Sequence, residues 1–181
     1  MKQTKTSFLT LEEVVLFGLF PALMLGTQMA LSALPNFHLT GVFIVILTRL
    51  FRGKALIPLY VYVLLAGFYI GFNIWWIPYL YIWTALWAMA MLIPKKLSKK
   101  WEYILCTAVC GLHGFLFGSL WALSQPLLTD LPWKSIHLYI LSGLSFDIAH
   151  GISNTVLGTL ISPICRTLRH VSFHRKKKDS D

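Results

Sequence analysis

Long apolar stretches, separated by short clusters of basic residues, are the feature that most constrains how this chain of 181 residues can fold. Hydrophobic residues make up 56% of it and charged residues only 13%, and the mean hydropathy is +0.66. A helix that spans a membrane needs about 20 mostly apolar residues, and backbone groups in lipid must be hydrogen-bonded within the helix. We therefore expect an all-α integral membrane protein, a six-helix bundle that forms one domain over residues 1–181.

Six segments of the sequence are candidates for membrane spans. They cover approximately residues 13–34, 39–51, 55–72, 78–94, 102–124 and 135–168, and a basic tail follows at 169–181. The first is not a cleavable signal peptide, because Glu12 and Glu13 precede an apolar run that is too long. The second is short, so it tilts little, continues into its flanks or crosses only in part.

The basic residues predict the orientation of these spans. Of the 16 Lys and Arg residues, 15 fall before the first span or at and beyond the ends of the second, fourth and sixth spans, and Lys134 alone falls in another loop. Loops rich in Lys and Arg stay on the cytoplasmic side. We expect both termini in the cytoplasm, a multi-pass protein of the cell membrane, and basic residues that set topology and contact anionic lipid.

Several function classes are disfavoured by composition and by missing motifs. A disordered chain would be less hydrophobic, and a nucleic-acid binder would need a basic face that these apolar stretches do not allow. The sequence contains no phosphate-binding G-x-x-x-x-G-K-[ST] loop, no H-E-x-x-H and no G-x-S-x-G. We therefore predict no enzyme, no catalytic residue, no cofactor and no metal site, and we interpret Cys106 and Cys110 as small packing residues on one helical face.

The sixth span carries three polar residues on one helical face. Asp147, His150 and Asn154 are spaced by three and four residues. Polar groups at this depth are costly unless they are paired, so they should face the bundle interior. Two interpretations stay open, a packing network of the three side chains and a ligand or ion pathway. For His113 in the fifth span we expect a packing histidine with its polar atoms satisfied.

Two spans carry small residues at every fourth position, which lets another helix approach closely. The first span has Gly18, Ala22, Gly26 and Ala30, and the fifth has Cys110, Gly114, Gly118 and Ala122. Such a stripe serves internal packing or the docking of a partner. The spacing alone does not say which stripe does which.

Four segments resemble the substrate-binding S components of energy-coupling-factor (ECF-type) vitamin ABC transporters. They are the A-L-S-A-L-P-N segment at 30–36 with the span that follows it, Y-I-G-F-N-I-W-W-I-P-Y-L-Y at 69–81, F-G-S-L-W-A at 117–122 and S-G-L-S-F-D-I-A-H-G-I-S-N at 142–154. The resemblance covers nearly the whole chain, and F-D-x-x-H-x-x-x-N in the sixth span is its most specific part.

The resemblance implies a subunit that captures a vitamin or related micronutrient from outside. It implies two kinds of protein partner, a transmembrane coupling subunit and two cytoplasmic ATPases, with docking through the first span at Gly18, Ala22, Gly26 and Ala30. A flat, polar-edged cargo is expected, of folate, flavin, corrinoid, queuosine-precursor or pyridoxine type. The expected substrate-binding residues are Asn36, Asn73, Trp75, Trp76, Tyr79, Trp83, Trp121, Gln125, Asp147, His150 and Asn154.

Two alternatives belong to other classes. One is a stand-alone, proton-coupled secondary transporter that uses Asp147 and His150 as a relay, although no internal repeat is visible. The other is a membrane enzyme with the same two residues as acid and base. For the aromatic residues of the outer loops, a plain interfacial belt remains as open as a stacking platform.

Overall fold

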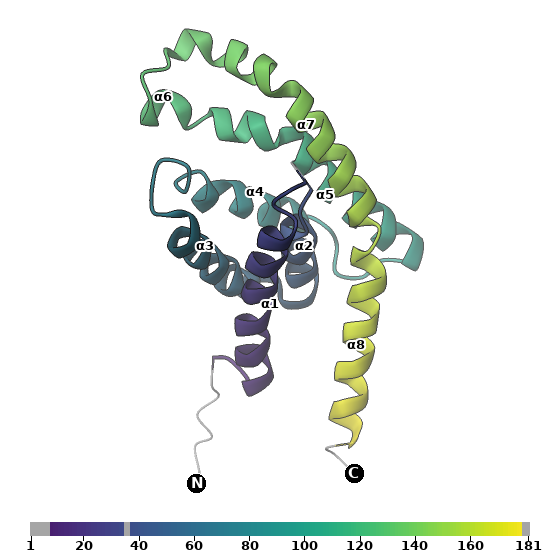
Figure 1. Ribbon diagram of the computed structural model, residues 1–181. Helices are drawn as coiled ribbons and strands as arrows, with labels where there is room; N and C mark the ends of the chain where they lie inside the picture. Colours follow the sequence, from purple (N-terminus) through teal and green to yellow (C-terminus); the bar gives the residue numbers. More distant parts are fainter. Residues whose placement is uncertain (1–7, 35–36, 179–181) are drawn as a thin grey trace.

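The computed structural model describes residues 8–34 and 37–178, with side chains described as far as His170, and the described residues form helices and no strand. The helices are α1 (Leu11–Ala30), α2 (Thr40–Phe51), α3 (Leu56–Ile70), α4 (Tyr79–Met91), α5 (Lys99–Ala122), α6 (Gln125–Leu128), α7 (Ile136–Gly158) and α8 (Ile161–Lys178). Two 3-10 turns, η1 (Arg52–Ala55) and η2 (Trp133–Ser135), join some of them (Figure 1). The all-α prediction is confirmed.

Three helical segments are long and apolar enough to cross a membrane, namely Leu11–Ala30, Lys99–Leu128 and Trp133–His170. They cover the first, fifth and sixth predicted spans. The helices of the other three spans have 12, 15 and 13 residues. At 1.5 Å per residue they are about 18–22 Å long, less than the roughly 30 Å of a hydrocarbon core. A membrane location is therefore indicated by three helices, and a six-span crossing remains a prediction.

The short helix α2 lies at the centre of the molecule. Nine of its 12 residues are buried, among them Ile44, Val45 and Ile46. It contacts α1, α4, α5, α7 and α8, so its apolar side chains form the middle of the core. The short second span raised the possibility that the helix continues into its flanks. On the C-terminal side this is wrong, because α2 ends at Phe51 and a 3-10 turn follows.

Helix α1 begins with a capping box, in which Thr10 and Glu13 exchange side-chain and backbone hydrogen bonds. Its buried face carries Phe17, Phe20 and Met24 and packs against α2 and α3. Glu13 also forms an ion pair with Lys54 in η1 at 2.8 Å. The start of the chain is thereby tied to the turn that follows α2.

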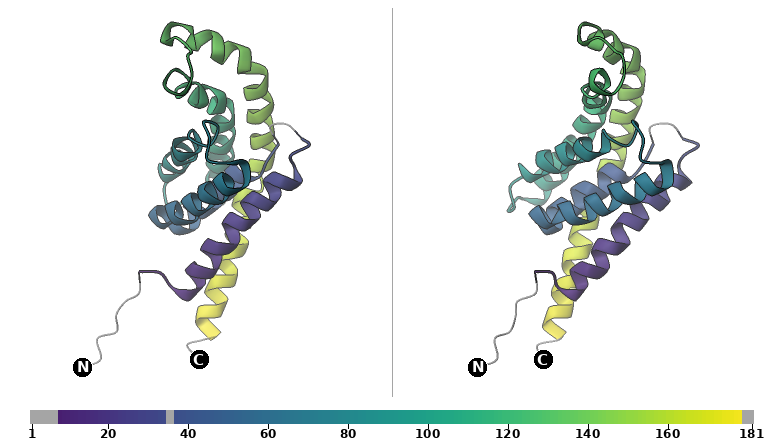
Figure 2. Two further views of the ribbon diagram at one scale, coloured as in Figure 1. Left: turned by 60° about the vertical axis from the view of Figure 1, so that its left-hand side comes forward. Right: turned by 90° about the vertical axis from the view of Figure 1, so that its left-hand side faces the viewer.

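Helices α5 and α7 pack side by side along much of their length (Figure 2). The predicted sixth span is not one helix. Instead α7 ends at Gly158, a turn covers Thr159 and Leu160, and α8 begins at Ile161. Pro163 explains the break, because its ring nitrogen cannot donate to the carbonyl of Thr159. The basic tail predicted at 169–181 continues α8 as far as Lys178.

The beginning of α1 and the end of α8 lie at the same end of the molecule, and α6 lies at the opposite end (Figures 1 and 2). This arrangement agrees with termini on one side of a membrane and with the loop after α5 on the other. The structure contains no membrane, so the side that faces the cytoplasm stays a prediction from the basic residues.

Candidate ligand-binding site

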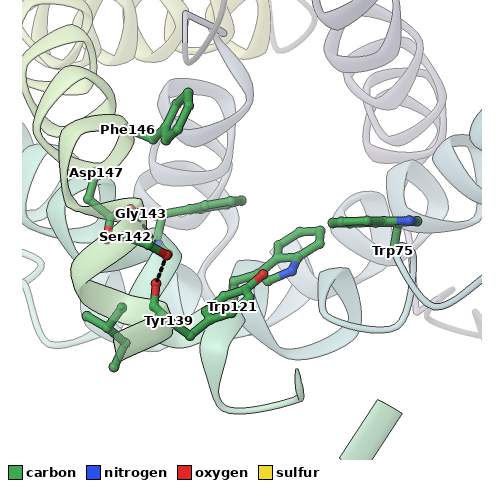
Figure 3. A pocket seen from close by; sticks show the side chains of 10 residues that line it. Trp75, Trp121, Tyr139, Ser142, Gly143, Phe146 and Asp147 are labelled. Carbon is green, nitrogen blue, oxygen red and sulfur yellow. Dashed lines mark hydrogen bonds between the residues drawn. The ribbon is translucent and has the colours of Figure 1, made fainter. Parts of the chain in front are cut away.

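Two neighbouring cavities lie at the end of the molecule that contains α6. The larger one, about 440 Å³, lies between α5, α7 and the segment that joins α3 to α4 (Figure 3). Its lining includes Trp75, Trp121, Tyr139, Phe146 and Asp147. The smaller one, about 270 Å³, shares Trp75 and Tyr139 with it and extends to Gln125 in α6. Four predicted site residues, Trp75, Trp121, Gln125 and Asp147, therefore line this pair of cavities.

Trp75 reaches the cavity because the segment between α3 and α4 is held in a tight turn. Asn73 accepts a hydrogen bond from the backbone N–H of Trp75 at 2.8 Å and donates one to the carbonyl of Ile70 at 3.2 Å. The ring of Trp75 then lies 5.8 Å from the ring of Trp121, centroid to centroid (Figure 3). Asn73 itself is exposed and shapes the loop.

The neighbouring Trp76 lies elsewhere. Its indole N–H donates to the carbonyl of Val63 in α3 at 2.8 Å, and its ring packs on Phe72. The sequence predicts both tryptophans as ligand faces, and of the two it is Trp75 that lines the cavities described above. The hydrogen bond of Trp76 holds the loop against α3. Asn36, also predicted at the site, lies outside the described residues.

A continuous set of aromatic contacts leads from the cavity into the core. Trp121 contacts Phe117 and Tyr79, with ring centroids 6.0 and 6.1 Å apart, and both of these contact Trp83 in α4. Trp83 is 1% exposed. The predicted residues Tyr79 and Trp83 therefore belong to one aromatic cluster with Trp121, although they stand behind the cavity wall.

Tyr79 also connects this cluster to α1. Tyr62 in α3 donates to the amide oxygen of Gln28 at 2.7 Å, and the amide nitrogen of Gln28 donates to the Tyr79 hydroxyl at 3.4 Å. Gln28 lies on α1, which carries the predicted docking stripe. A polar contact therefore joins that helix to an aromatic residue beside the cavity.

The three polar residues of α7 do not form the packing network that the sequence left open. The carboxylate of Asp147 accepts a hydrogen bond from the backbone N–H of Gly118 in α5 at 2.7 Å. The Nε2 atom of His150 and both polar atoms of the Asn154 amide have no hydrogen-bond partner in the described chain. All three residues are buried. The face is therefore divided between a carboxylate that joins two helices and two side chains with unused polar atoms.

His38, which the sequence did not single out, lies against this face. Its ring centroid is 4.6 Å from that of His150, and its buried Nδ1 has no partner either. Burial lowers the pKa of His38 to about 4, so the ring is neutral at pH 7. The available signal was its position directly before the second span, in a loop without Lys or Arg. For His113 we expected both ring nitrogens to be paired. Its Nε2 atom bonds to the carbonyl of Ile82 at 3.0 Å, and its Nδ1 atom has no partner among the described residues.

The two stripes of small residues differ in what they face. On α1, Gly18, Ala22, Gly26 and Ala30 are all exposed, and a Cβ atom added at either glycine would meet nothing within 4 Å. On α5, a Cβ atom at Gly114 would lie 2.8 Å from the carbonyl oxygen of His150. The α5 stripe therefore packs against α7, and among the described residues the α1 stripe is a free surface that allows close approach.

An ion cluster at the opposite end, in which Glu102 and Arg49 are buried, was not predicted from the sequence. Glu102 in α5 accepts from Arg49 in α2 at 2.9 Å and from Arg169 in α8 at 2.9 Å. Arg49 donates further to the carbonyls of Ile93 and Pro94. The sequence predicts Arg49 and Arg169 as topology determinants. Through Glu102 they also hold α2, α5 and α8 together.

No family model, no curated protein and no solved structure matches this chain. The resemblance to S components therefore rests on the motifs in the sequence. Within the described residues, no group of three or more His, Cys, Asp or Glu side chains is arranged to hold a metal ion.

Proposed function

We propose that this chain is the substrate-binding S component of an ECF-type ABC importer in a bacterial cytoplasmic membrane. The observation that carries the proposal is the aromatic cavity between Trp75, Trp121 and Asp147, at the end of the molecule opposite the beginning of α1 and the end of α8 (Figure 1). With the predicted orientation, this cavity opens toward the outside. A pocket with aromatic walls and a few polar groups is typical of a site for a flat organic molecule.

The surface of α1 supports the same proposal. An S component has no ATPase and must dock to a transmembrane coupling subunit that carries two cytoplasmic ATPases. The four small residues on α1 are exposed and leave a helix face without bulky side chains. In lipid, helices associate through such faces by close backbone packing. We assign docking to this face and capture of a vitamin-like micronutrient to the cavity.

The proton-coupled carrier receives less support from the geometry. A relay between Asp147 and His150 requires a hydrogen bond or a bridging water between them. The Asp147 carboxylate instead accepts from the backbone of α5, and His150 Nε2 has no hydrogen-bond partner among the described residues. We therefore propose an import subunit and assign no catalytic role to the residues that line the cavity.

Purification of the tagged chain from native membranes tests the proposal. We expect a transmembrane subunit and two ATPases to purify with it, and uptake of the cargo to depend on ATP hydrolysis by that module. Uptake by the chain alone in proteoliposomes, driven by a pH gradient, would establish the carrier instead. Mass spectrometry of small molecules bound to the purified chain identifies the cargo.

A further inference from the structure

Four rings, those of His38, Trp83, His113 and His150, meet in the interior behind Phe117. Asn154 follows His150 by one turn of α7, and we call the five side chains the inner cluster. The His38 ring contacts Trp83 and His150, with centroids 5.9 and 4.6 Å away. Trp83 contacts His113 at 5.7 Å. The Asn154 amide nitrogen lies 3.0 Å from where a Cβ atom on Gly114 would stand, on the α5 face that packs against α7. The cluster therefore combines the segment before α2 with α4, α5 and α7.

Every member of the inner cluster has a buried polar atom without a partner in the described chain. The atoms are Nδ1 of His38 and His113, Nε2 of His150, Nε1 of Trp83 and both polar atoms of the Asn154 amide. Trp83, His113, His150 and Asn154 are each at most 2% exposed. Folded proteins pair nearly all buried polar atoms, so this concentration in one place points to a ligand that supplies the partners.

The chemistry of the cluster restricts that ligand. The indole N–H of Trp83 can only donate, while an amide and neutral imidazoles can both donate and accept. None of the five side chains carries a fixed charge, and Asp147, the carboxylate on the same face of α7, is engaged by Gly118. A charged group brought into this interior would lack a counter-ion. The ligand moiety should be neutral, with donors and acceptors together on its edge.

Aromatic walls restrict its shape as well. Phe117 lines the outer cavity and also lies 4.6 Å from the His150 ring and 5.5 Å from the Trp83 ring. It therefore separates the cavity from the inner cluster. A ligand that reaches the inner cluster from the cavity must displace this side chain, and the rings of Phe117 and Trp83 would then offer faces to a flat ring.

We propose that the inner cluster is a second subsite, which binds a neutral nitrogen heterocycle at one end of the cargo while the rest lies against Trp75 and Trp121. This inference rests on the proposed function at one point, namely that the bound molecule is a cargo for import. Its test uses the purified full-length chain alone. A chain that binds the heterocycle but never purifies with ATPases keeps the subsite and loses the transporter assignment.

Matched probes test the charge of the ligand. Nicotinamide, hypoxanthine and lumichrome serve as neutral heterocycles, and nicotinate and thiamine as charged ones, each titrated against the chain in lipid nanodiscs. We expect at least one neutral probe to quench tryptophan fluorescence and raise the melting temperature, and nicotinate to bind at least 10-fold more weakly than nicotinamide. Binding of charged probes only, or of none of the five, overturns the assignment.

Two substitutions test the location without relying on the probe alone. His150→Phe and Asn154→Leu remove unpaired polar atoms and keep most of the volume, so the melting temperature without ligand should stay unchanged or rise. Affinity for the bound probe should fall at least 10-fold. His137→Phe, the same change at an exposed position of α7, is the matched control and should alter neither. A fall in melting temperature with unchanged affinity would make the cluster a packing element and overturn the proposal.

Discussion

The carboxylate of Asp147 on α7 accepts a hydrogen bond from the backbone N–H of Gly118 on α5, and a Cβ atom at position 118 would lie 2.5 Å from that carboxylate oxygen. The two helices can approach this closely because residue 118 has no side chain. The contact fixes one wall of the cavity, since both residues line it.

Gly118→Ala should therefore lower the stability of the protein. The added methyl group must displace Asp147 or separate α5 from α7, which costs about 1–3 kcal/mol. Thermal unfolding in detergent measures the effect. Gly18→Ala is the control, because nothing lies within 4 Å of its added Cβ and alanine favours the helix. Equal melting temperatures for the two variants would contradict the close contact.

Gly26→Leu should abolish uptake in cells and leave ligand binding by the purified chain intact. The leucine side chain would hold a partner helix away from the exposed face of α1. Uptake of labelled cargo and titration of the purified variant give the two readings. If binding and uptake decline together, α1 acts on the site and not through docking.

Glu102→Gln should destabilise the chain strongly. It leaves Arg49, which is buried, and Arg169 without their shared counter-charge, and breaking a buried ion pair costs roughly 3–5 kcal/mol. Asp130→Asn, at an exposed loop position, is the control and should have little effect. Chemical unfolding gives the free energy of unfolding of both variants. An unchanged value for Glu102→Gln would mean that the arginines are held by backbone carbonyls alone.

Acid should destabilise the protein partly through His38. The pKa of His38 falls from 6.5 to about 4 on folding because burial disfavours the charged ring. The unfolded chain therefore binds the proton first, and the stability that His38 contributes is present above pH 6.5 and lost as the pH falls from 6.5 to 4. The melting temperature should drop less over this range in His38→Phe than in the unaltered chain. Both proteins contain His113 and His150, so the difference between them reports on His38. Identical pH dependence would show that His38 titrates normally.

Reporter fusions should place Trp76 and Asp130 on the outside and the ends of the chain on the inside. The distribution of basic residues requires this arrangement. Alkaline phosphatase activity at the two loop positions and green fluorescence at the C-terminus measure it. A cytoplasmic reading at Trp76 would show that the short helices α2 and α3 do not both cross.

The helix positions could be predicted from the sequence because hydropathy is local. The fifth span was expected at 102–124 and α5 covers Lys99–Ala122. The break after Gly158 was also encoded locally, by Pro163, but the apolar pattern continues across it and concealed it. Periodicity correctly grouped Asp147, His150 and Asn154 on one buried face.

Features that depend on distant partners could not be predicted. Trp75 and Trp76 are adjacent and chemically alike, and contacts with the carbonyl of Val63 and the ring of Phe72 hold the second one elsewhere. Arg49 has the same sequence context as a topology-determining arginine, and its partner Glu102 lies 53 positions further on. His38 joins the inner cluster only because α7 returns beside the segment before α2.

The ion cluster around Glu102 has a consequence for how the chain is assembled. Arg49 and Arg169 are 120 positions apart, and the guanidinium of Arg169 lies 3.5 Å from the backbone carbonyl of Arg49. During synthesis, α2 is complete before α5 and long before α8, so Arg49 gains its counter-charge only when α5 brings Glu102, and Arg169 reaches the same carboxylate last. We infer that the surroundings of the central helix are completed in two steps, first by α5 and then by α8.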